Sequence, residues 1–452
     1  MLSRADRSGA PHVGRPDAPY SPACFVTAVE RQAVASVTPD RLPALRRRIS
    51  AVLIATQILG GLGVATGIAL AAVLATEVSG TESLSGLAPT ATVAGTAVLS
   101  MPLAALMTAR GRRPGLVLAY LIGAVGAGVT VVAAGIGSFP LLLCGMAAFG
   151  AASSANLQAR FAAADLAEPE RRARAISLVV WATTIGAVLG PNIASPAGRS
   201  VTGLGIPAAA GPFLWAAGIF LISAVVVAVL LRPDPLLTAR ALAPDDEHSA
   251  AARSLRAGMA AVAASPRARL AVVTVAVAHT AMVSVMAMTP VDLAHHGAGI
   301  DLIGLVISGH IAGMYAFAPL MGRLSDRLGR LPGIGLAVGL LACAVFLAGT
   351  AGAGHGQTAV GLFVLGLGWS AGLVSGSALL TDSVPQPARA AAQGLSDLVM
   401  NASAGVGGAA AGLVVAKASY GWLNFTAACL LLPLAALALF TRRRAAAVPA
   451  GD

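Results

Sequence analysis

Twelve long apolar runs constrain the fold of this chain more than any other feature. A bilayer core about 30 Å thick requires roughly 20 apolar residues per helix, and it offers no water to satisfy backbone polar groups. The runs lie near residues 51–75, 84–107, 114–136, 139–164, 175–197, 207–231, 269–291, 302–321, 332–353, 357–381, 391–416 and 420–441. The sequence therefore predicts an all-α membrane protein with 12 transmembrane helices.

Composition supports this prediction and excludes several classes of function. Of the 452 residues, 57% are hydrophobic and 11% are charged, whereas soluble proteins carry about 25% charged residues. The net charge of +11 is divided among short arginine clusters between the apolar runs, which argues against a nucleic-acid partner. The cysteines form no CxxC pair, and no Walker A or CxxCH sequence occurs. We therefore expect neither enzyme activity nor a resident cofactor.

Positive charge marks one side of the predicted protein. Arginines cluster before the first run, after the last run and in alternate loops, near residues 46–48, 110–113, 171–174, 323–330 and 442–444. The opposite loops hold only Arg199 and Lys417. By the positive-inside rule, both termini face the cytoplasm, as expected in a plasma (inner) membrane.

A long polar segment divides the twelve runs into two sets of six. The predicted parts are a disordered cytoplasmic N-terminal tail, a first six-helix bundle, a cytoplasmic linker, a second six-helix bundle and a cytoplasmic C-terminal tail, at residues 1–45, 46–231, 232–268, 269–441 and 442–452.

The two halves also resemble each other in sequence. ARGRRPG joins runs two and three, GRLSDRLGR joins runs eight and nine, and the aligned Gly111 and Gly329 lie 218 residues apart. Asp165 and Asp382, each followed by an arginine seven residues later, lie 217 residues apart. Two unrelated landmarks with nearly the same offset indicate a duplicated six-helix unit, which is typical of transporters.

The second of these loops carries a family motif. Gly322, Asp326, Arg327, Gly329 and Arg330 match the signature G-x-x-x-D-R-x-G-R of the major facilitator superfamily, which the chain resembles over the region between its two tails. The resemblance implies two pseudo-symmetric bundles that rock around a central site by alternating access. An Asp near a helix end can hold a neighbouring helix N-terminus in one state and release it in the other, so we expect this loop to act in gating.

The first-half copy departs from the motif. It keeps Gly111, Arg112 and Arg113, but Thr108 replaces the Asp and Ala104 replaces the first Gly. We expect the three retained residues to act in gating. The departure leaves open how the first-half gate is latched.

The sequence GAVLGP in the fifth run resembles the g-x-x-x-G-P motif of proton-coupled drug antiporters. Gly186 and Gly190 would allow close helix packing, and Pro191 would permit a bend. Ala194 and Ser195 stand where paired glycines are expected after the proline, so the match is partial.

Ionisable residues inside the predicted spans are few and therefore informative. Asp397 shares one face of the eleventh span with Gln393 and Asn401. It is either a proton carrier, since buried carboxylates can exchange protons near neutral pH, or the partner of a cytoplasmic-side arginine. We expect Arg160, at the end of the fourth span, to reach back to the interface rather than face the cavity. Trp369 either lines the pathway or packs in the interior.

Residues 279–321 concentrate sulfur and imidazole side chains. They hold five of the eleven methionines and four of the seven histidines. Met282 and Met286 form MxxxM in the seventh span, and His310 and Met314 form HxxxM in the eighth, so each pair shares a helix face. If the seventh and eighth spans run antiparallel as a hairpin, the two pairs lie at about the same depth in the membrane. Thioether and imidazole ligands suit Cu(I).

This joint pattern resembles that of the CcoA-like copper importers of the same superfamily, with 24 residues from Met286 to His310. The resemblance implies that copper, as substrate, passes Met282, Met286, His310 and Met314, with His279 as an adjacent candidate. The alternative is that the methionines fill the core. The same branch resembles transporters of organic molecules, including riboflavin.

The sequence thus favours copper import. The alternatives are a proton-coupled antiporter that exports drugs or metabolites, and uptake of a small organic molecule such as riboflavin. A transporter-like sensor ranks last, because no signalling domain follows Arg444. We expect the lipid bilayer and the substrate to be the partners of a monomer.

Overall fold

The computed structural model describes residues 39–81, 84, 86–242 and 255–446. These residues form helices and no strands, and twelve segments among them are long and apolar enough to cross a membrane. The predicted all-α fold with 12 spans is confirmed. Most of the predicted N-terminal tail, the middle of the linker and the end of the C-terminal tail lie outside the described residues.

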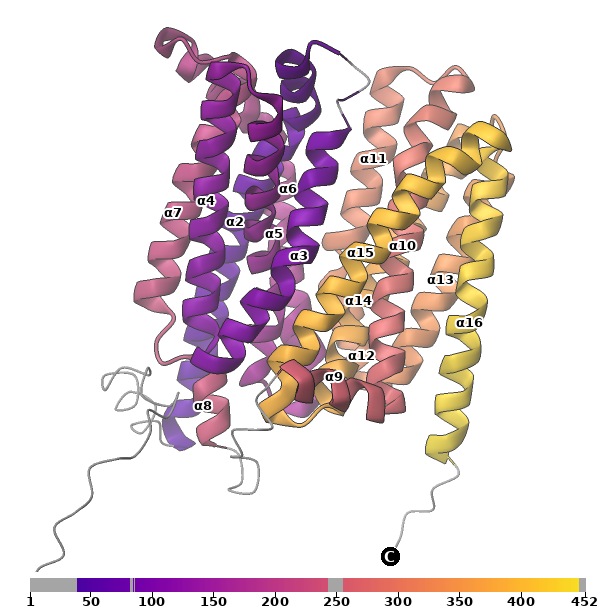
Figure 1. The fold of residues 1–452 in the computed structure, drawn as a ribbon. Helices are drawn as coiled ribbons and strands as arrows, with labels where there is room; N and C mark the ends of the chain where they lie inside the picture. Colours follow the sequence, from indigo (N-terminus) through magenta and orange to yellow (C-terminus); the bar gives the residue numbers. More distant parts are fainter. Residues whose placement is uncertain (1–38, 82–83, 85, 243–254, 447–452) are drawn as a thin grey trace, which may run out of the picture.

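The first six spans pack into one bundle, on the left in Figure 1. They are α2 (Leu42–Ser79), α3 (Leu87–Arg110), α4 (Arg112–Ile136), α5 (Phe139–Asp165), α6 (Arg172–Val201) and α7 (Gly211–Leu230). The ring of Phe149 lies 5.7 Å from that of Phe213 and 5.3 Å from that of Phe220. A Cβ at Gly126 would lie 2.3 Å from the backbone nitrogen of Phe149, so α4 and α5 approach backbone to backbone.

The remaining six spans form the second bundle, on the right in Figure 1. They are α10 (Pro266–His295), α11 (Ile300–Tyr315) with α12 (Ala318–Leu328), α13 (Arg330–Thr350), α14 (His355–Ser383), α15 (Arg389–Lys417) and α16 (Tyr420–Ala446). α14 packs against both α10 and α11: a Cβ at Gly372 would meet Ala278, and one at Gly366 would meet the backbone of His310.

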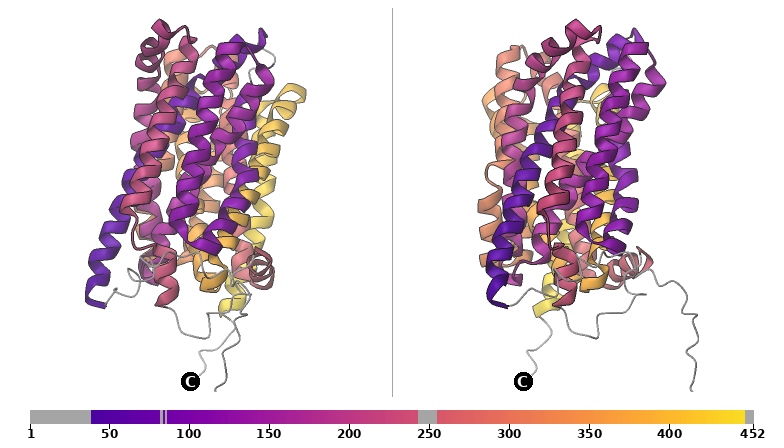
Figure 2. Two further views of the ribbon diagram at one scale, coloured as in Figure 1. Left: turned by 60° about the vertical axis from the view of Figure 1, so that its left-hand side comes forward. Right: turned by 90° about the vertical axis from the view of Figure 1, so that its left-hand side faces the viewer.

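The helix ends of both bundles that carry the arginine clusters lie together at the lower end of Figure 1, where α2 begins and α16 ends. We call this the arginine-rich end. In both views of Figure 2 this end again points downward, and in the right-hand view the first bundle stands in front of the second. An even number of spans returns the chain to the side on which it started.

The eighth span differs from its predicted form because it is broken into two helices. α11 ends at Tyr315, and α12 begins at Ala318 with Pro319 in its first turn. Proline has no N–H to donate, so it is favoured at a helix start and disfavoured inside a helix. The break places Tyr315 beside the space between the bundles and lets α12 pack against α6.

The predicted polar linker contains two short helices, α8 (Pro235–Ala241) and α9 (Leu255–Ala264). Asp234 caps α8: its carboxylate accepts the backbone N–H groups of Leu236 and Leu237, at 2.9 and 3.1 Å. The same carboxylate accepts the backbone N–H of Arg113 at 2.7 Å. The start of the linker is therefore fastened to the first bundle at the loop between α3 and α4.

Candidate functional site

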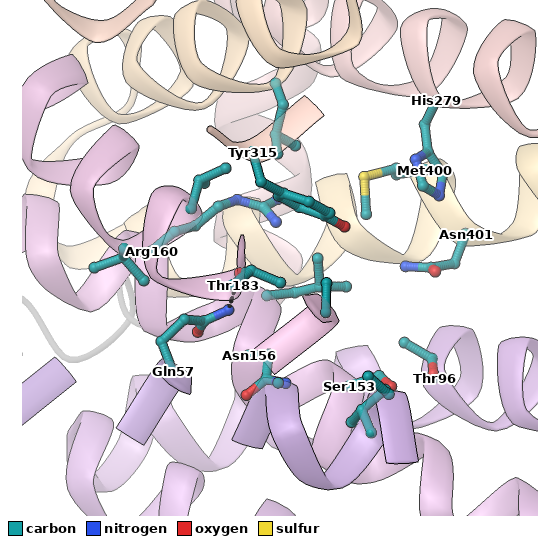
Figure 3. Close-up of a pocket in the computed structure, with 18 of the residues that line it drawn as sticks. Gln57, Thr96, Ser153, Asn156, Arg160, Thr183, His279, Tyr315, Met400 and Asn401 are labelled. Atoms are coloured by element: carbon teal, nitrogen blue, oxygen red, sulfur yellow. Dashed lines mark hydrogen bonds between the residues drawn. The ribbon is translucent and has the colours of Figure 1, made fainter. Parts of the chain in front are cut away.

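A cavity of about 410 Å³ lies between the two bundles. Helices α2, α3, α5 and α6 form one wall, and α10, α11, α14 and α15 form the other. Its polar and aromatic lining consists of Gln57, Thr92, Thr96, Ser153, Asn156, Arg160, Thr183, His279, Tyr315, Trp369 and Asn401, most of which Figure 3 labels. A volume of a few hundred Å³ with a few polar groups on an apolar lining is typical of a small-molecule site.

Hydrogen bonds hold the amide groups of the first-bundle wall. Gln57 Nε2 donates to Thr183 Oγ1 at 2.9 Å, and the Tyr120 hydroxyl donates to Asn156 Oδ1 at 2.9 Å. Gln57 Oε1 is buried and has no partner among the described residues. This carbonyl oxygen is therefore available to accept a hydrogen bond from a ligand.

The second-bundle wall is aromatic. Trp369 Nε1 donates to His279 Nδ1 at 2.9 Å, and the Tyr315 ring meets the Trp369 ring edge-on at 5.5 Å between centroids. An indole N–H can only donate, so Nδ1 of His279 accepts and the neutral ring carries its hydrogen on Nε2. This wall therefore presents a flat aromatic surface, with the Nε2–H group of His279 beside it as a hydrogen-bond donor.

A buried ion pair closes the cavity towards the arginine-rich end. Arg160, a cavity-lining residue, donates to Asp397 Oδ1 at 2.6 Å across the boundary between the bundles. Arg160 and Asp397 are 2% and 1% exposed. The expectation that Arg160 reaches back to the interface is therefore wrong, because a carboxylate within the interior neutralises it. Of the two expectations for Asp397, the geometry shows the arginine partner.

The ion pair belongs to a larger cluster, which we call the first junction; it consists of Arg112, Gln158, Arg160, Asp165, Gln393 and Asp397. Arg112 binds both oxygens of Asp165, at 2.8 and 3.2 Å, and donates to Gln158 Oε1 at 2.9 Å. It also donates to Gln393 on α15. Gln158 Nε2 donates to Asp397 Oδ2 at 2.8 Å. The cluster thus joins α4 and α5 of the first bundle to α15 of the second.

A second cluster joins α6 to α12, α13 and α14; we call it the second junction, and it consists of Arg172, Asp326, Arg330 and Asp382 with nearby backbone groups. Asp326 accepts the backbone N–H groups of Ala173 and Arg174, at 3.2 and 2.9 Å, at the start of α6. Arg330 donates to Asp326 and to Asp382, the latter at 3.0 Å. Arg172 donates to Asp382 at 2.6 Å.

Among the other predicted gating residues, Gly111 lies just before α4 beside the first junction, and Gly329 lies just before α13 beside the second. Gly111 has φ of +96° and Gly329 has φ of +98°, a backbone conformation that favours glycine. A Cβ at Gly111 would also lie 2.6 Å from Asp234 Oδ2. Arg327 is exposed on α12. The gating role assigned to these residues stays a prediction.

The GAVLGP segment packs α6 against α2. A Cβ at Gly186 would lie 2.5 Å from the backbone of Gly61, and one at Gly190 would lie 2.5 Å from the Ala65 side chain. Both glycines therefore lie where α6 closely approaches α2, while the role of the motif in transport stays a prediction. α6 stays helical through Pro191 as far as Val201.

The predicted sulfur and imidazole ligands occupy two places. His279 lines the central cavity, whereas Met282, Met286, His310 and Met314 are not among its lining residues. His310 is fully buried, its Nδ1 lies 2.7 Å from the carbonyl oxygen of Leu362, and its Nε2 has no partner among the described residues. Trp369 on α14 contacts both His279 on α10 and Tyr315 on α11, and the predicted convergence of the two ligand pairs stays a prediction.

Several residues of the site escaped prediction. Gln57 and Thr183 were not singled out, although a glutamine inside an apolar run is itself a signal. Tyr315 was missed because the break after it was not foreseen. Asp165 was noted only as a landmark of the repeat and Gln158 was not singled out, since their bonds to Arg112 depend on how α4 and α5 pack.

Comparison with known proteins bears on this architecture of two bundles around a cavity. The family model described as Major Facilitator Superfamily matches residues 52–293 and 270–451. The chain belongs to the major facilitator superfamily. It is 35% identical over 408 residues to the uncharacterized MFS-type transporter YddS of Bacillus subtilis, covering 90% of this chain and 94% of that protein.

Two further comparisons add detail. The chain is 30% identical over 398 residues to the riboflavin transporter RfnT of Brucella anthropi, covering 87% of this chain and 94% of the relative. The proton:xylose symporter XylE, solved with 6-bromo-6-deoxy-D-glucose bound, superposes with a TM-score of 0.66 at 16% identity, over 89% of this chain and 96% of that one. At that identity the structural match shows the fold alone. From the family match and these relatives, the protein whose structure is described above is a membrane transporter.

Proposed function

We propose that the protein moves a small organic molecule with a flat ring through the central cavity by alternating access. The cavity carries the proposal: its aromatic wall, its free Gln57 oxygen and its buried arginine suit a ring with polar substituents. The riboflavin transporter RfnT, at 30% identity, supports the same substrate class. Both walls come from one chain, so we propose that the transport unit is a monomer.

Uptake of radiolabelled riboflavin, the first probe, tests this proposal in cells that express the protein. Trp369→Ala removes the ring surface of the cavity and should lower initial uptake at least tenfold. Trp422→Ala is the matched control, since Trp422 is 58% exposed on α16. Wild-type uptake no greater than that of cells without the protein would reject riboflavin, and equal uptake by the two variants would reject the role of the aromatic wall.

Copper import is the second candidate, and His310 favours it. Its Nδ1 hydrogen bond to the Leu362 carbonyl leaves Nε2 with a free lone pair, which is how protein metal ligands are commonly oriented. Met314 lies one turn away on the same face, and Met282 belongs to the same apolar core of the second bundle. In this proposal copper is cargo that passes Met282, Met286, His310 and Met314.

Radiocopper uptake separates this candidate from the first. Met286→Ala and His310→Ala should each reduce copper uptake at least tenfold, whereas Met288→Ala, which packs against the same core, should not. Unchanged uptake in the first two variants would reject the copper route. Riboflavin uptake in the same variants shows whether they still fold and transport.

We also propose that Asp397 couples transport to protons. It is buried between the bundles, and its partner Arg160 reaches the cavity, so protonation and substrate binding would bear on the same ion pair. Asp397→Asn should abolish the dependence of transport on a proton gradient while counterflow of substrate continues. A variant that still accumulates substrate with a proton gradient would reject the assignment. Proton-driven efflux by wild type would instead favour the antiporter.

We propose further that the arginine-rich end faces the cytoplasm of the plasma (inner) membrane. Twelve spans and the arginine clusters support this orientation. A cysteine at position 109, in a variant without the native cysteines, should react with an impermeant maleimide only after the cells are opened. Labelling in intact cells would reverse the orientation.

A further inference from the structure

A second hollow of about 820 Å³ lies at the arginine-rich end of the first bundle, away from the central cavity. It is formed where the start of α2, the end of α5 and the start of α6 meet, and we call it the arginine groove. Its charged lining consists of Arg46, Arg47, Glu168, Arg171 and Arg174. The indigo start of α2, which forms one side of it, lies at the edge of the bundle in both views of Figure 2.

The charges in the arginine groove are unbalanced. Glu168 is the one acidic residue among four arginines, and it binds Arg46 at 2.5 Å and Arg171 at 3.5 Å. The side chains of Arg47 and Arg174 are exposed and form no ion pair with the described residues. Arg46 Nε is buried without a partner among those residues. The groove therefore has net positive charge and unused N–H donors.

Apart from Ser50, the remainder of the groove is apolar and runs along the spans. Its apolar residues are Pro43, Ile49, Ala51, Ile54, Ala163, Leu166, Ala167, Ala175 and Leu178. Ile54 lies eight residues beyond Arg46 on α2, or about 12 Å along the helix. The positive charge thus stands at the ends of the spans, and the apolar strip extends from it towards the middle of the membrane.

We propose that the arginine groove binds an anionic phospholipid, with the phosphate among the arginines and one acyl chain along the apolar strip. Basic pockets between transmembrane helices bind anionic head groups, and guanidinium groups bind phosphate oxygens in bidentate fashion. A free phosphate would use the arginines alone. The apolar strip, on helices that cross the membrane, selects the lipid instead.

The groove also adjoins the second junction. The carbonyl oxygen of Pro169, next to Glu168, accepts a hydrogen bond from Arg330 at 2.5 Å, and the backbone N–H of Arg174 bonds Asp326. The segment that forms one wall of the groove is therefore held by the second bundle. A lipid bound there occupies a site whose shape depends on the junction being formed.

Native mass spectrometry of the full-length protein, titrated with phosphatidylglycerol or with phosphatidylcholine of the same chains, tests the proposal. Wild type should bind phosphatidylglycerol at least tenfold more tightly. The triple variant Arg47→Gln, Arg171→Gln, Arg174→Gln should lose roughly a hundredfold in affinity for it. The matched control is Arg267→Gln, Arg269→Gln, Arg323→Gln, which removes the same charge from exposed positions outside the groove and should bind as wild type does.

A second variant tests the acyl chain. Ala51→Trp leaves every arginine in place but fills the apolar strip, and it should weaken phosphatidylglycerol binding at least fivefold. Inorganic phosphate at the same concentrations should not displace the lipid. Four outcomes would each overturn the proposal. They are equal binding of the two lipids, equal loss of affinity in the triple variant and its control, wild-type affinity in Ala51→Trp, and displacement of the lipid by phosphate.

Discussion

At the second junction, Asp326 accepts two backbone N–H groups from the start of α6. At the corresponding place in the first half stands Thr108, whose hydroxyl donates to the carbonyl of Ala104 on its own helix at 2.7 Å. The first junction reaches α15 by another route, through Arg112 and Gln393 and through Asp397 with its two donors. The duplicated halves thus keep the same helix contact while using different atoms to hold it.

Beside each junction two helices cross closely, and the two halves also differ in which helix carries the glycine that allows this. A Cβ at Gly322 on α12 would lie 2.2 Å from Ser177 Oγ on α6. In the first half Ala104 replaces this glycine, and a Cβ at Gly394 on α15 would lie 2.2 Å from the Ala104 side chain. The glycine therefore lies on α12 in one crossing and on α15, the partner of α3, in the other. Each crossing has one glycine, and either helix of the pair can supply it.

The junctions also differ in burial. The side chains of Arg112 and Asp165 are both 0% exposed, whereas those of Arg330 and Asp382 are 13% and 25% exposed. Charges nearer to water are screened more strongly by salt. The first junction should therefore hold at high ionic strength while the second weakens.

The largest expected effect comes from Asp326→Asn. The variant loses the charge that binds Arg330 and the N-terminus of α6, and hydrogen bonds to charged groups contribute about 1.5–3 kcal/mol each. We expect the open fraction of the second junction to rise about a hundredfold, measured as the distance distribution between spin labels at residues 167 and 328. Thr108→Val is the matched control in the first half, and an equal effect of both variants would contradict the comparison.

A smaller effect is expected from Gly394→Ala. Its methyl group meets Ala104, and overpacking costs about 1–3 kcal/mol, so the open fraction of the first junction should rise about tenfold. Spin labels at residues 109 and 260 would measure it.

The double variant Ala104→Gly, Gly394→Ala should restore the wild-type distribution, because it returns the glycine to the helix that carries it in the second half. Failure of this rescue would show that the two crossings are not equivalent.

The smallest effect is expected from Gln393→Ala. It removes one acceptor of Arg112 but leaves Asp165, Gln158 and the ion pair of Asp397 in place. The open fraction of the first junction should rise about threefold to tenfold, in keeping with about 1 kcal/mol for one hydrogen bond. The same label pair measures it, and no change in the second-junction labels is expected.

Sequence reasoning reached the features that depend on local pattern or on repetition. Apolar run length gave twelve spans, and the matching offsets of Gly111 with Gly329 and of Asp165 with Asp382 indicated the duplication. The equivalent pairs Arg112–Asp165 and Arg330–Asp382 bear this out in three dimensions. The loop motif identified Asp326 and Arg330 before their partners were known.

Features that depend on contacts between distant segments were not predictable in the same way. Nothing in the sequence near Arg160 reveals that a carboxylate 237 residues later will neutralise it. The glycine exchange at the crossings needs both helices of each pair in view. Likewise, Asp234 lies within the segment predicted as a polar linker, and only the fold brings it to the backbone of Arg113.

Each oxygen of Asp397 faces a nitrogen donor from the first bundle. Oδ1 receives Arg160, which has no lone pair to offer, and Oδ2 receives the amide nitrogen of Gln158. Gln158 cannot turn its oxygen round to Asp397 without giving up Arg112, which already occupies that oxygen. Each oxygen keeps a second lone pair, so a proton can be held without displacing either donor, but it removes the negative charge that both donors bind. Loss of that charge weakens both bonds that Asp397 accepts across the boundary between the bundles.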